Sequence, residues 1–360
     1  MIGEIFGGYR LIKQLGEGGM GAVYLGEHVG RRERAAIKVL LPSHSKNPDM
    51  VHRFFNEAKA AASVAHPGIV NVLDSGMQQE RAYIVMELLE GESLSSRLRR
   101  GRLSEAEVIT VARQLADALT AAHDKGIIHR DLKPDNIFLV PSNDALGYRA
   151  KILDFGIAKL THDSEGRHTQ TGALLGTPLY MSPEQCRGAK VDQRADIYSL
   201  GCIVYEMIAG RTPFLGPGLG QLLTAHILEQ PPPLVGVQRQ ELKAAVEWAL
   251  AKEPNDRPQR MADFAHALVS GPRNYDAEPT LKPTPNPAFS GAQTKILDPG
   301  SSAPQTMLLD PDVARGKVPL RPQPSPSTPR PPGDSSMGIA IAAIVIALIA
   351  IGAAIYGLTQ

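Results

Sequence analysis

Strand-like and helix-like patterns of apolar residues alternate along the first 90 residues of the chain. Strand character occurs in three runs within residues 9–41 and again at 69–76 and 82–91. Between them, the dipeptide 47–48 offers an asparagine cap and a first-turn proline to a helix, and residues 49–65 carry apolar side chains at helical spacing. The pattern predicts a small antiparallel sheet with a helix inserted between its strands.

The rest of the folded sequence is mostly helical. Residues 104–126 show helical periodicity, open with a capping box from Ser104 to Glu107 and stop at Gly126. Similar periodicity recurs at residues 196–210, 242–254 and 261–271. Because the strands come first and the helices afterwards, we expect an α+β fold with a sheet-rich N-lobe and a helical C-lobe.

The composition changes near residue 270. Residues 270–336 are rich in proline, serine and threonine and lack sustained apolar periodicity. Such a segment buries too little apolar surface to offset its ordering entropy, so we predict a disordered linker. The folded domain is expected to occupy residues 9–269.

Residues 337–358 contain no charged residue and are long enough to cross a bilayer as a helix. A buried core helix is the alternative, but the linker leaves this segment no core to enter. Arg321 and Arg330 precede the segment, and no basic residue follows it. By the positive-inside rule, we expect a single-pass protein of the cell membrane with its N-terminal domain in the cytoplasm.

Charge and cysteine content exclude several functional classes. The formal net charge of the 360 residues is +1, which gives no general electrostatic reason to expect a nucleic-acid partner. Cys186 and Cys202 lack the spacing of a disulfide framework or a redox motif, and packing is the simplest role for both. The histidines show no zinc-site spacing.

A glycine-rich turn follows the first strand. Gly16, Gly18 and Gly21 form a GxGxxGxV pattern, in which missing side chains allow close approach to phosphate oxygens. The pattern alone does not exclude an ordinary flexible hairpin. The residues after it continue as a strand, so the setting is not that of a dinucleotide-binding fold.

Further motifs follow this turn in a fixed order. They are Lys38 in "AAIKVL", Glu57 in the next helix, His129-Arg130-Asp131, Lys133, Asn136, Asp154-Phe155-Gly156 and Ser182-Pro183-Glu184. With these motifs, residues 9–269 resemble the eukaryotic-like (Hanks-type) serine/threonine protein kinases, most closely the bacterial branch. The resemblance implies a bilobal kinase fold and transfer of the γ-phosphate of ATP to serine or threonine.

The resemblance also implies a role for each motif. Asp131 is expected to act as the catalytic base and Lys133 to lie near the transferred phosphate. Asn136 and Asp154 are expected to hold Mg²⁺. Lys38 would bind the ATP phosphates and be oriented by Glu57.

The implied ATP site encloses the nucleotide from both lobes. The adenine would lie between apolar side chains of the two lobes, with Met86 at the back and backbone groups of Glu87 and Leu89 contacting the base. Core packing is the alternative role for Met86 and Leu139. The full expected set is Leu15, Gly16, Glu17, Gly18, Gly19, Met20, Gly21, Ala22, Val23, Ala36, Lys38, Glu57, Met86, Glu87, Leu89 and Leu139.

The segment between Asp154 and Glu184 carries the expected regulatory features. By resemblance, Thr177 positions the protein substrate, and Glu184 pairs with Arg257 as a buried structural contact. We expect a phosphate on Thr169 or Thr171 to order the segment through Arg130 and neighbouring basic groups. The alternative is an ordinary loop without a regulated site.

Three other functions are alternatives to protein phosphorylation. A pseudokinase-like membrane scaffold with a phosphorylation-dependent docking tail would not need the intact set of charged motif residues. A small-molecule phosphotransferase would lack Lys133 and the segment around Thr177. An interaction protein would act through its linker and anchor alone, and the linker can also add such a role to an enzyme.

The linker and the membrane segment suggest partners. The linker repeats "QTKILDP" and "QTMLLDP", and a phosphate on Thr294 or Thr306 would resemble the ligands of forkhead-associated domains. A duplicated spacer without a reader is the alternative. Small residues four apart at 343/347 and 353/357 suit a homodimer through the membrane, although an alanine-rich span produces such pairs by chance.

Overall fold

A computed structural model of the 360-residue chain describes residues 1–143, 147–155 and 178–272. In this part of the chain, no helix combines the length and apolar character needed to cross a membrane. The predicted linker and membrane segment lie outside the described residues, as do Gly156 and the three threonines 169, 171 and 177.

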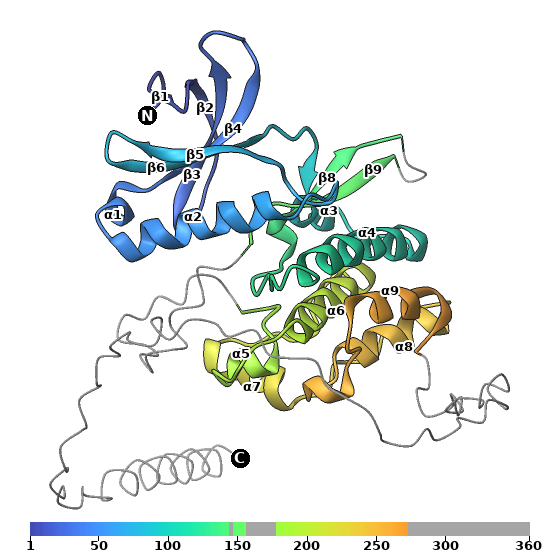
Figure 1. The fold of residues 1–360 in the computed structure, drawn as a ribbon. Coiled ribbons are helices and arrows are strands. Elements are labelled where there is room, and N and C mark those ends of the chain that lie inside the picture. Colours follow the sequence, from blue (N-terminus) through green and yellow to red (C-terminus); the bar gives the residue numbers. More distant parts are fainter. Residues whose placement is uncertain (144–146, 156–177, 273–360) are drawn as a thin grey trace, which may run out of the picture. The chain divides into compact units, whose positions relative to one another are not determined.

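The N-terminal sheet forms where the alternating pattern predicted strands. Within residues 1–143 the first six strands form one antiparallel sheet in the order β1-β2-β3-β4-β6-β5, with β5 at one edge (Figure 1). Their bounds are β1 Ile5–Phe6, β2 Tyr9–Glu17, β3 Gly21–His28, β4 Arg34–Leu40, β5 Val72–Gln78 and β6 Arg81–Glu87.

Two helices enter this sheet region after β4. Helix α1 is a single turn over Pro42–Ser45, and α2 extends over Pro48–Ser63. The Asn47 side chain accepts hydrogen bonds from two first-turn amides of α2, as its capping role predicted. The apolar face of α2 buries Phe54 and Ala58 against the sheet, and this packing fixes α2 relative to β4 and β6.

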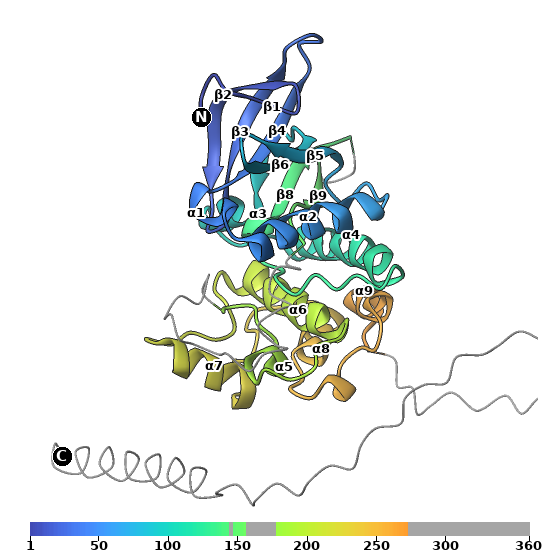
Figure 2. The same ribbon diagram turned by 60° about the vertical axis from the view of Figure 1, so that its left-hand side comes forward.

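The remaining elements are mostly helices, gathered at the other end of the domain in Figures 1 and 2. A small sheet pairs β7, β8 and β9 in that order. The bounds are β7 Glu92–Ser93, α3 Leu94–Arg99, α4 Glu105–His123, β8 Ile137–Pro141, β9 Tyr148–Ile152, α5 Pro183–Cys186, α6 Arg194–Ala209, α7 Leu219–Leu228, α8 Gln240–Ala249 and α9 Met261–Ser270. Short 3₁₀ turns occur at Pro134–Asn136 and Pro254–Asp256.

A sheet-rich N-lobe and a helical C-lobe therefore form as predicted. The capping box of α4 is present, with Ser104 and Glu107 each accepting a backbone hydrogen bond from the other. The predicted stop is also confirmed: α4 ends at His123, and Gly126, whose φ is +71°, closes the helix with its amide donating to the His123 carbonyl at 2.8 Å and the Ile127 amide donating to the Ala122 carbonyl at 3.0 Å. Helix α4 lies in the centre of the larger core, where Leu115 and Leu119 are fully buried.

Candidate active site

The glycine-rich turn links β2 to β3. The Gly18 amide donates to the Gly21 carbonyl at 2.9 Å, which closes the turn. A β-carbon on Gly21 would lie 2.6 Å from the Val39 carbonyl oxygen, so the fold itself requires glycine there. A β-carbon on Gly16 would meet nothing within 4 Å, and one on Gly18 only the Gly21 carbonyl oxygen at 3.9 Å. The packing of the described residues thus requires glycine at position 21 and does not account for Gly16 and Gly18.

Lys38 lies beneath this turn, between two carboxylates. It sits on β4 opposite Val23 of β3 and is 8% exposed. Its Nζ is 3.0 Å from Asp154 Oδ2 and 3.5 Å from Glu57 Oε2. Glu57 on α2 and Asp154, just after β9, therefore both contact the Lys38 ammonium group.

Burial and charge act on this triad in opposite directions. Burial lowers the pKa of Lys38, but the charges of Asp154 and Glu57 more than offset this, so the pKa is raised from its usual value. Burial raises the pKa of Glu57 to about 7, against the lowering effect of the Lys38 charge. Asp154 is the nearer and more exposed partner of the lysine, which leaves the buried Glu57 incompletely neutralised.

The catalytic-base candidate lies on the loop between α4 and β8. Lys133 Nζ donates to Asp131 Oδ2 at 3.0 Å, and Asn136 Nδ2 donates to the Asp131 carbonyl at 3.0 Å. The Leu153 amide donates to the Asn136 carbonyl at 2.9 Å. Because β8 starts directly after Asn136 and β9 ends just before Leu153, pairing of the two strands brings the expected metal ligands Asn136 and Asp154 to one end of the hairpin.

Asp196 holds this loop in place through hydrogen bonds, a role that the sequence did not predict. Its Oδ2 accepts from the His129 amide and from His123 Nε2, both at 2.8 Å, and its Oδ1 accepts from the Arg130 amide at 2.8 Å. Asp196 is fully buried; burial raises its pKa, but the hydrogen bond and charge of His123 and the charge of His129 outweigh this and lower it. The only sequence signal was a carboxylate in the first turn of an apolar helix.

The same loop passes through a strained backbone conformation. Arg130 has a φ of +64°, which is costly for a residue with a side chain. Its amide is held by Asp196, and its carbonyl accepts from Gln185 Nε2 at 2.8 Å. Two long-range contacts, from α6 and α5, therefore fix the backbone immediately before Asp131.

The expected adenine contacts lie where the two lobes meet. Ala36 and Met86 are paired across β4 and β6, and Met86 is 9% exposed. Leu139 of β8 is 4% exposed and belongs to the core of the C-lobe. Both Met86 and Leu139 are therefore packing residues, as the alternative held, and this is compatible with contact to a base.

The segment after β6 contains the expected backbone contacts. The Glu87 amide already donates to the Asn71 carbonyl at 3.0 Å, while its side chain accepts from the Asn71 amide and from Lys151 Nζ. A contact from Glu87 to a bound base is therefore left to its carbonyl oxygen. Leu89 is partly buried against the same cluster as Met86.

The predicted structural ion pair is present. Arg257 donates to both Glu184 oxygens at 2.8 Å, and the two residues are 1% and 5% exposed. The arginine also donates to the Ala251 and Lys252 carbonyls. This bidentate pair ties α5 to the segment after α8 and stabilises the fold from outside the reacting centre.

Comparison with known families decides the class of this site. The sequence profile described as "Protein kinase domain" matches residues 9–269. The chain belongs to the protein kinase family. Family membership implies use of ATP and Mg²⁺.

Bacterial protein kinases are among the relatives of this domain. It is 46% identical over 272 residues to serine/threonine-protein kinase Pkn1 of Myxococcus xanthus and 37% identical over 304 residues to PknA of Mycobacterium tuberculosis. These matches cover 74% and 81% of this chain but 39% and 68% of Pkn1 and PknA. The kinase domain of Mycobacterium tuberculosis PknI matches 74% of the chain and 98% of its own length, at 30% identity and a TM-score of 0.57. The domain is thus of the bacterial Hanks type, in the serine/threonine class.

Proposed function

We propose that this protein transfers the γ-phosphate of ATP to serine and threonine side chains of proteins. The observation that carries the proposal is the convergence of Lys38, Glu57 and Asp154 on one side with Asp131, Lys133 and Asn136 on the other. These six side chains come from α2, β4, the loop before β8 and the residues just after β9. Phosphoryl transfer depends mainly on positioning and charge neutralisation, which such a set supplies.

The roles of the side chains follow from their contacts. Asp131 accepts the hydrogen bond and proton of the acceptor hydroxyl, and the Lys133 ammonium holds the carboxylate at 3.0 Å. Lys38 donates to phosphate oxygens, and Glu57 keeps the ammonium in place from the buried side. Arg130 and Asp196 position the base without contacting the substrate.

The residues present fit ATP and Mg²⁺. Gly16 and Gly18 leave space that a β-carbon would occupy, beside a buried lysine. No cluster of three acidic, histidine or cysteine ligands occurs in the described residues. Mg²⁺ in phosphoryl-transfer sites is held by one or two carboxylates plus phosphate oxygens and water. Asp154 and Asn136 would therefore supply enough protein ligands for Mg²⁺. The metal would supply neutralisation of phosphate charge.

A transfer assay with matched variants tests this function. We expect Asp131→Asn and Lys38→Met to lower kcat by at least about 10²-fold, because they remove the base and the phosphate contact. Tm should change little in Asp131→Asn and should fall in Lys38→Met, which leaves the buried Glu57 without its partner, so kcat is measured well below the Tm of each variant. Asp124→Asn and Lys13→Met make the same chemical changes outside the site and should keep full activity. Equal activity in all five proteins would contradict the assignment.

Anchoring belongs to the proposal as well. Residues 337–358 would hold the kinase to the cell membrane as a single span, with the catalytic domain in the cytoplasm. Paired small residues in the span would support a homodimer. Fractionation of cells that express the full chain, compared with a chain that ends at residue 336, tests this directly: loss of membrane association only in the shorter chain is expected.

The proposal also includes phosphorylation of two segments of the chain, the activation segment and the linker. Phosphate on Thr169 or Thr171 would order the activation segment through Arg130 and neighbouring basic groups. Phosphate on Thr294 or Thr306 would recruit forkhead-associated-domain proteins, as substrates or readers, to the membrane. Tethering to the kinase raises the effective concentration of these linker sites to about millimolar, which favours self-phosphorylation of a weak site.

The second candidate is a membrane scaffold that binds nucleotide without transferring phosphate. It would share the fold, the span and the tail. The intact Lys38 and Asp131 contacts favour the enzyme, because a scaffold gains nothing from positioning a base against a lysine at 3.0 Å. Nucleotide binding without any transfer by the wild-type chain would favour the scaffold.

A further inference from the structure

The tip of the glycine-rich turn is held by residues that follow β4. The Leu41 amide donates to the Met20 carbonyl at 3.0 Å. One residue earlier in the turn, the Gly19 carbonyl oxygen lies 3.0 Å from Nε2 of His44, a residue of α1. A carbonyl oxygen only accepts hydrogen bonds, so the imidazole donates through its Nε2–H. Two successive carbonyls of the turn are thus fixed by residues 41–44.

Side-chain packing restrains this turn very little. Leu15 is 49% exposed, and Gly18 and Gly19 are exposed as well. Glycine also loses more conformational freedom than any other residue when a segment becomes ordered. The conformation of the turn therefore depends on its few hydrogen bonds, and the bond to the Gly19 carbonyl comes from the His44 side chain.

The bond from His44 also sets the direction of the next amide in the turn. In a planar trans peptide group, the carbonyl and the N–H point in opposite directions. Because the Gly19 carbonyl points toward His44, the N–H of Met20 in the same peptide group points away from it. Within the described residues this N–H has no hydrogen-bond partner. It is therefore available as a backbone donor to a phosphate oxygen.

His44 belongs to a segment that is itself well held. The His44 and Ser45 amides donate to the Leu41 carbonyl at 2.9 and 3.0 Å, which closes the single turn of α1. The Asn47 amide donates to the His44 carbonyl at 3.0 Å, and the Asn47 side chain caps α2. The imidazole is therefore carried by a hydrogen-bonded turn that is joined directly to the start of α2.

We propose that His44 is a positioning residue for ATP, which holds the glycine-rich turn in the conformation that receives the phosphates. The identity of the ligand rests on the proposed function. His44 acts through the Gly19 carbonyl and the Met20 amide and does not contact the nucleotide. A turn that is already ordered loses less conformational freedom when the phosphates bind, so it binds them more tightly. Loss of this bond should weaken the binding of nucleotides that carry phosphates and leave the binding of adenosine unchanged.

Calorimetric titration of the full chain in detergent tests this role. The probes are adenosine and the Mg²⁺ complex of adenylyl imidodiphosphate, an ATP analogue whose terminal phosphate is not transferred. His44→Ala should bind the analogue about 3- to 10-fold more weakly than the wild type, the effect of losing one hydrogen bond, and should bind adenosine equally well. His44→Gln keeps an N–H donor at a similar reach and should stay within about 2-fold of the wild type.

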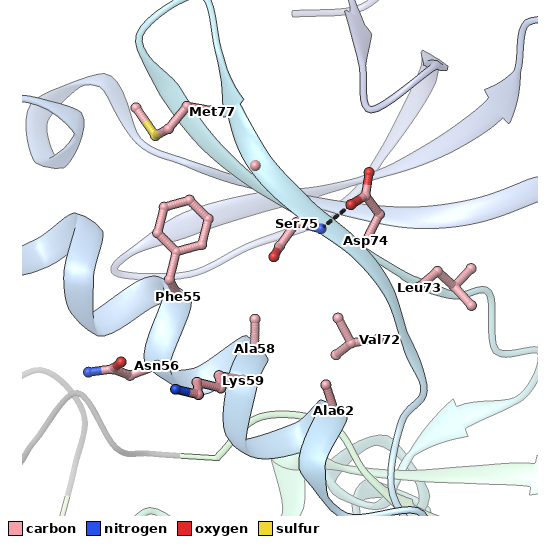
Figure 3. Close-up of a pocket in the computed structure, with 11 residues that line it drawn as sticks. Phe55, Asn56, Ala58, Lys59, Ala62, Val72, Leu73, Asp74, Ser75 and Met77 are labelled. Atoms are coloured by element: carbon pink, nitrogen blue, oxygen red, sulfur yellow. Dashed lines mark hydrogen bonds between the residues drawn. The ribbon is translucent and has the colours of Figure 1, made fainter.

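His52→Ala is the matched control. His52 lies on α2, and its Nδ1 accepts a hydrogen bond from Asn56 Nδ2 at 3.2 Å. Figure 3 shows Asn56 among the residues that line a groove between α2 and β5, and no residue of the glycine-rich turn or of α1 lines that groove. The control therefore makes the same chemical change and also removes one side-chain hydrogen bond of the N-lobe, but it leaves the turn intact. Its affinity for both probes should equal that of the wild type.

Several results would overturn the role of His44. One is unchanged affinity of His44→Ala for the analogue; another is an equal loss in His52→Ala or an equal loss for adenosine, since either would indicate a general effect on the N-lobe. A His44→Gln variant as weak as His44→Ala would show that the N–H donor is not what matters. In the transfer assay, the loss in His44→Ala should appear in the KM for ATP and not in kcat.

The same titration separates this role from the proposed function. A wild type that binds the analogue in the expected way and transfers no phosphate would contradict the proposed function and leave the role of His44 intact. A wild type that transfers phosphate, with a His44→Ala variant that binds the analogue equally tightly, would do the reverse. A wild type that binds no analogue would overturn both.

Discussion

Asp196→Ala is expected to impair both stability and catalysis, because one buried carboxylate holds the catalytic loop. The substitution leaves two backbone amides and His123 Nε2 without their acceptor in a buried place. Each unsatisfied buried group costs about 1–3 kcal/mol, and breaking a buried charged network costs about 3–5 kcal/mol. For a domain of this size, we expect Tm to fall by roughly 6–20 °C.

The catalytic effect is separable from the stability effect. Arg130 is held at a φ of +64° by the Asp196 contact to its amide, and Asp131 follows it directly. Release of that strain displaces the base, and a displacement of about 1 Å costs on the order of 10²-fold in rate. Thermal unfolding gives Tm, and kcat should be measured at least 15 °C below the Tm of the variant.

Asp192→Ala is the matched control. Asp192 lies just before the same helix, pairs with Arg194 at 2.7 Å and has a side chain that is 47% exposed. Its loss should cost no more than about 1 kcal/mol and leave kcat unchanged. If Asp196→Ala kept the wild-type kcat while folded, the loop would not depend on this carboxylate and our account of the loop would be wrong.

Three further outcomes are expected. The pKa of Glu57 in the folded state is raised to about 7, so the protonated form of Glu57 stabilises the fold. This stabilisation is full below about pH 4.5 and is lost as pH rises through 7. Denaturant unfolding should therefore show that the wild type loses stability relative to Glu57→Gln over that pH window. Glu184→Gln should lower the unfolding free energy by about 3–5 kcal/mol, whereas an unchanged midpoint would contradict a buried pair with Arg257. Gly21→Ala should lower Tm, while Gly18→Ala should keep Tm and raise the KM for ATP; equal Tm losses would remove the distinction between them.

The fold was predictable where local pattern decides the structure. Alternation predicted β2, β3 and β4, and the asparagine cap predicted the start of α2. Helix α7 and the β8–β9 hairpin were not predicted. The sequence of β8 is a short apolar run directly after Asn136, and that of its partner β9 alternates weakly, so neither indicates their pairing.

The sequence predicted the candidate reacting residues of the site but not the residues that hold the catalytic loop in place. Lys38, Glu57 and Asp131 stand in motifs whose order implies their roles, and the structure brings them to one region. Asp196 and Gln185 contact the catalytic loop across 55 to 67 residues of sequence. Such contacts depend on how α5 and α6 pack beneath the loop, which a local pattern does not contain.

Mass spectrometry of the phosphatase-treated full chain after incubation with Mg-ATP tests the central claim most directly. The account predicts new phosphate on serine or threonine residues of the wild type, and none on Asp131→Asn under the same conditions. Nucleotide binding should be similar in both, because Asp131 lies outside the expected ATP contacts. A wild-type chain that binds ATP and remains free of phosphate, alone and with added protein substrate, would contradict the account.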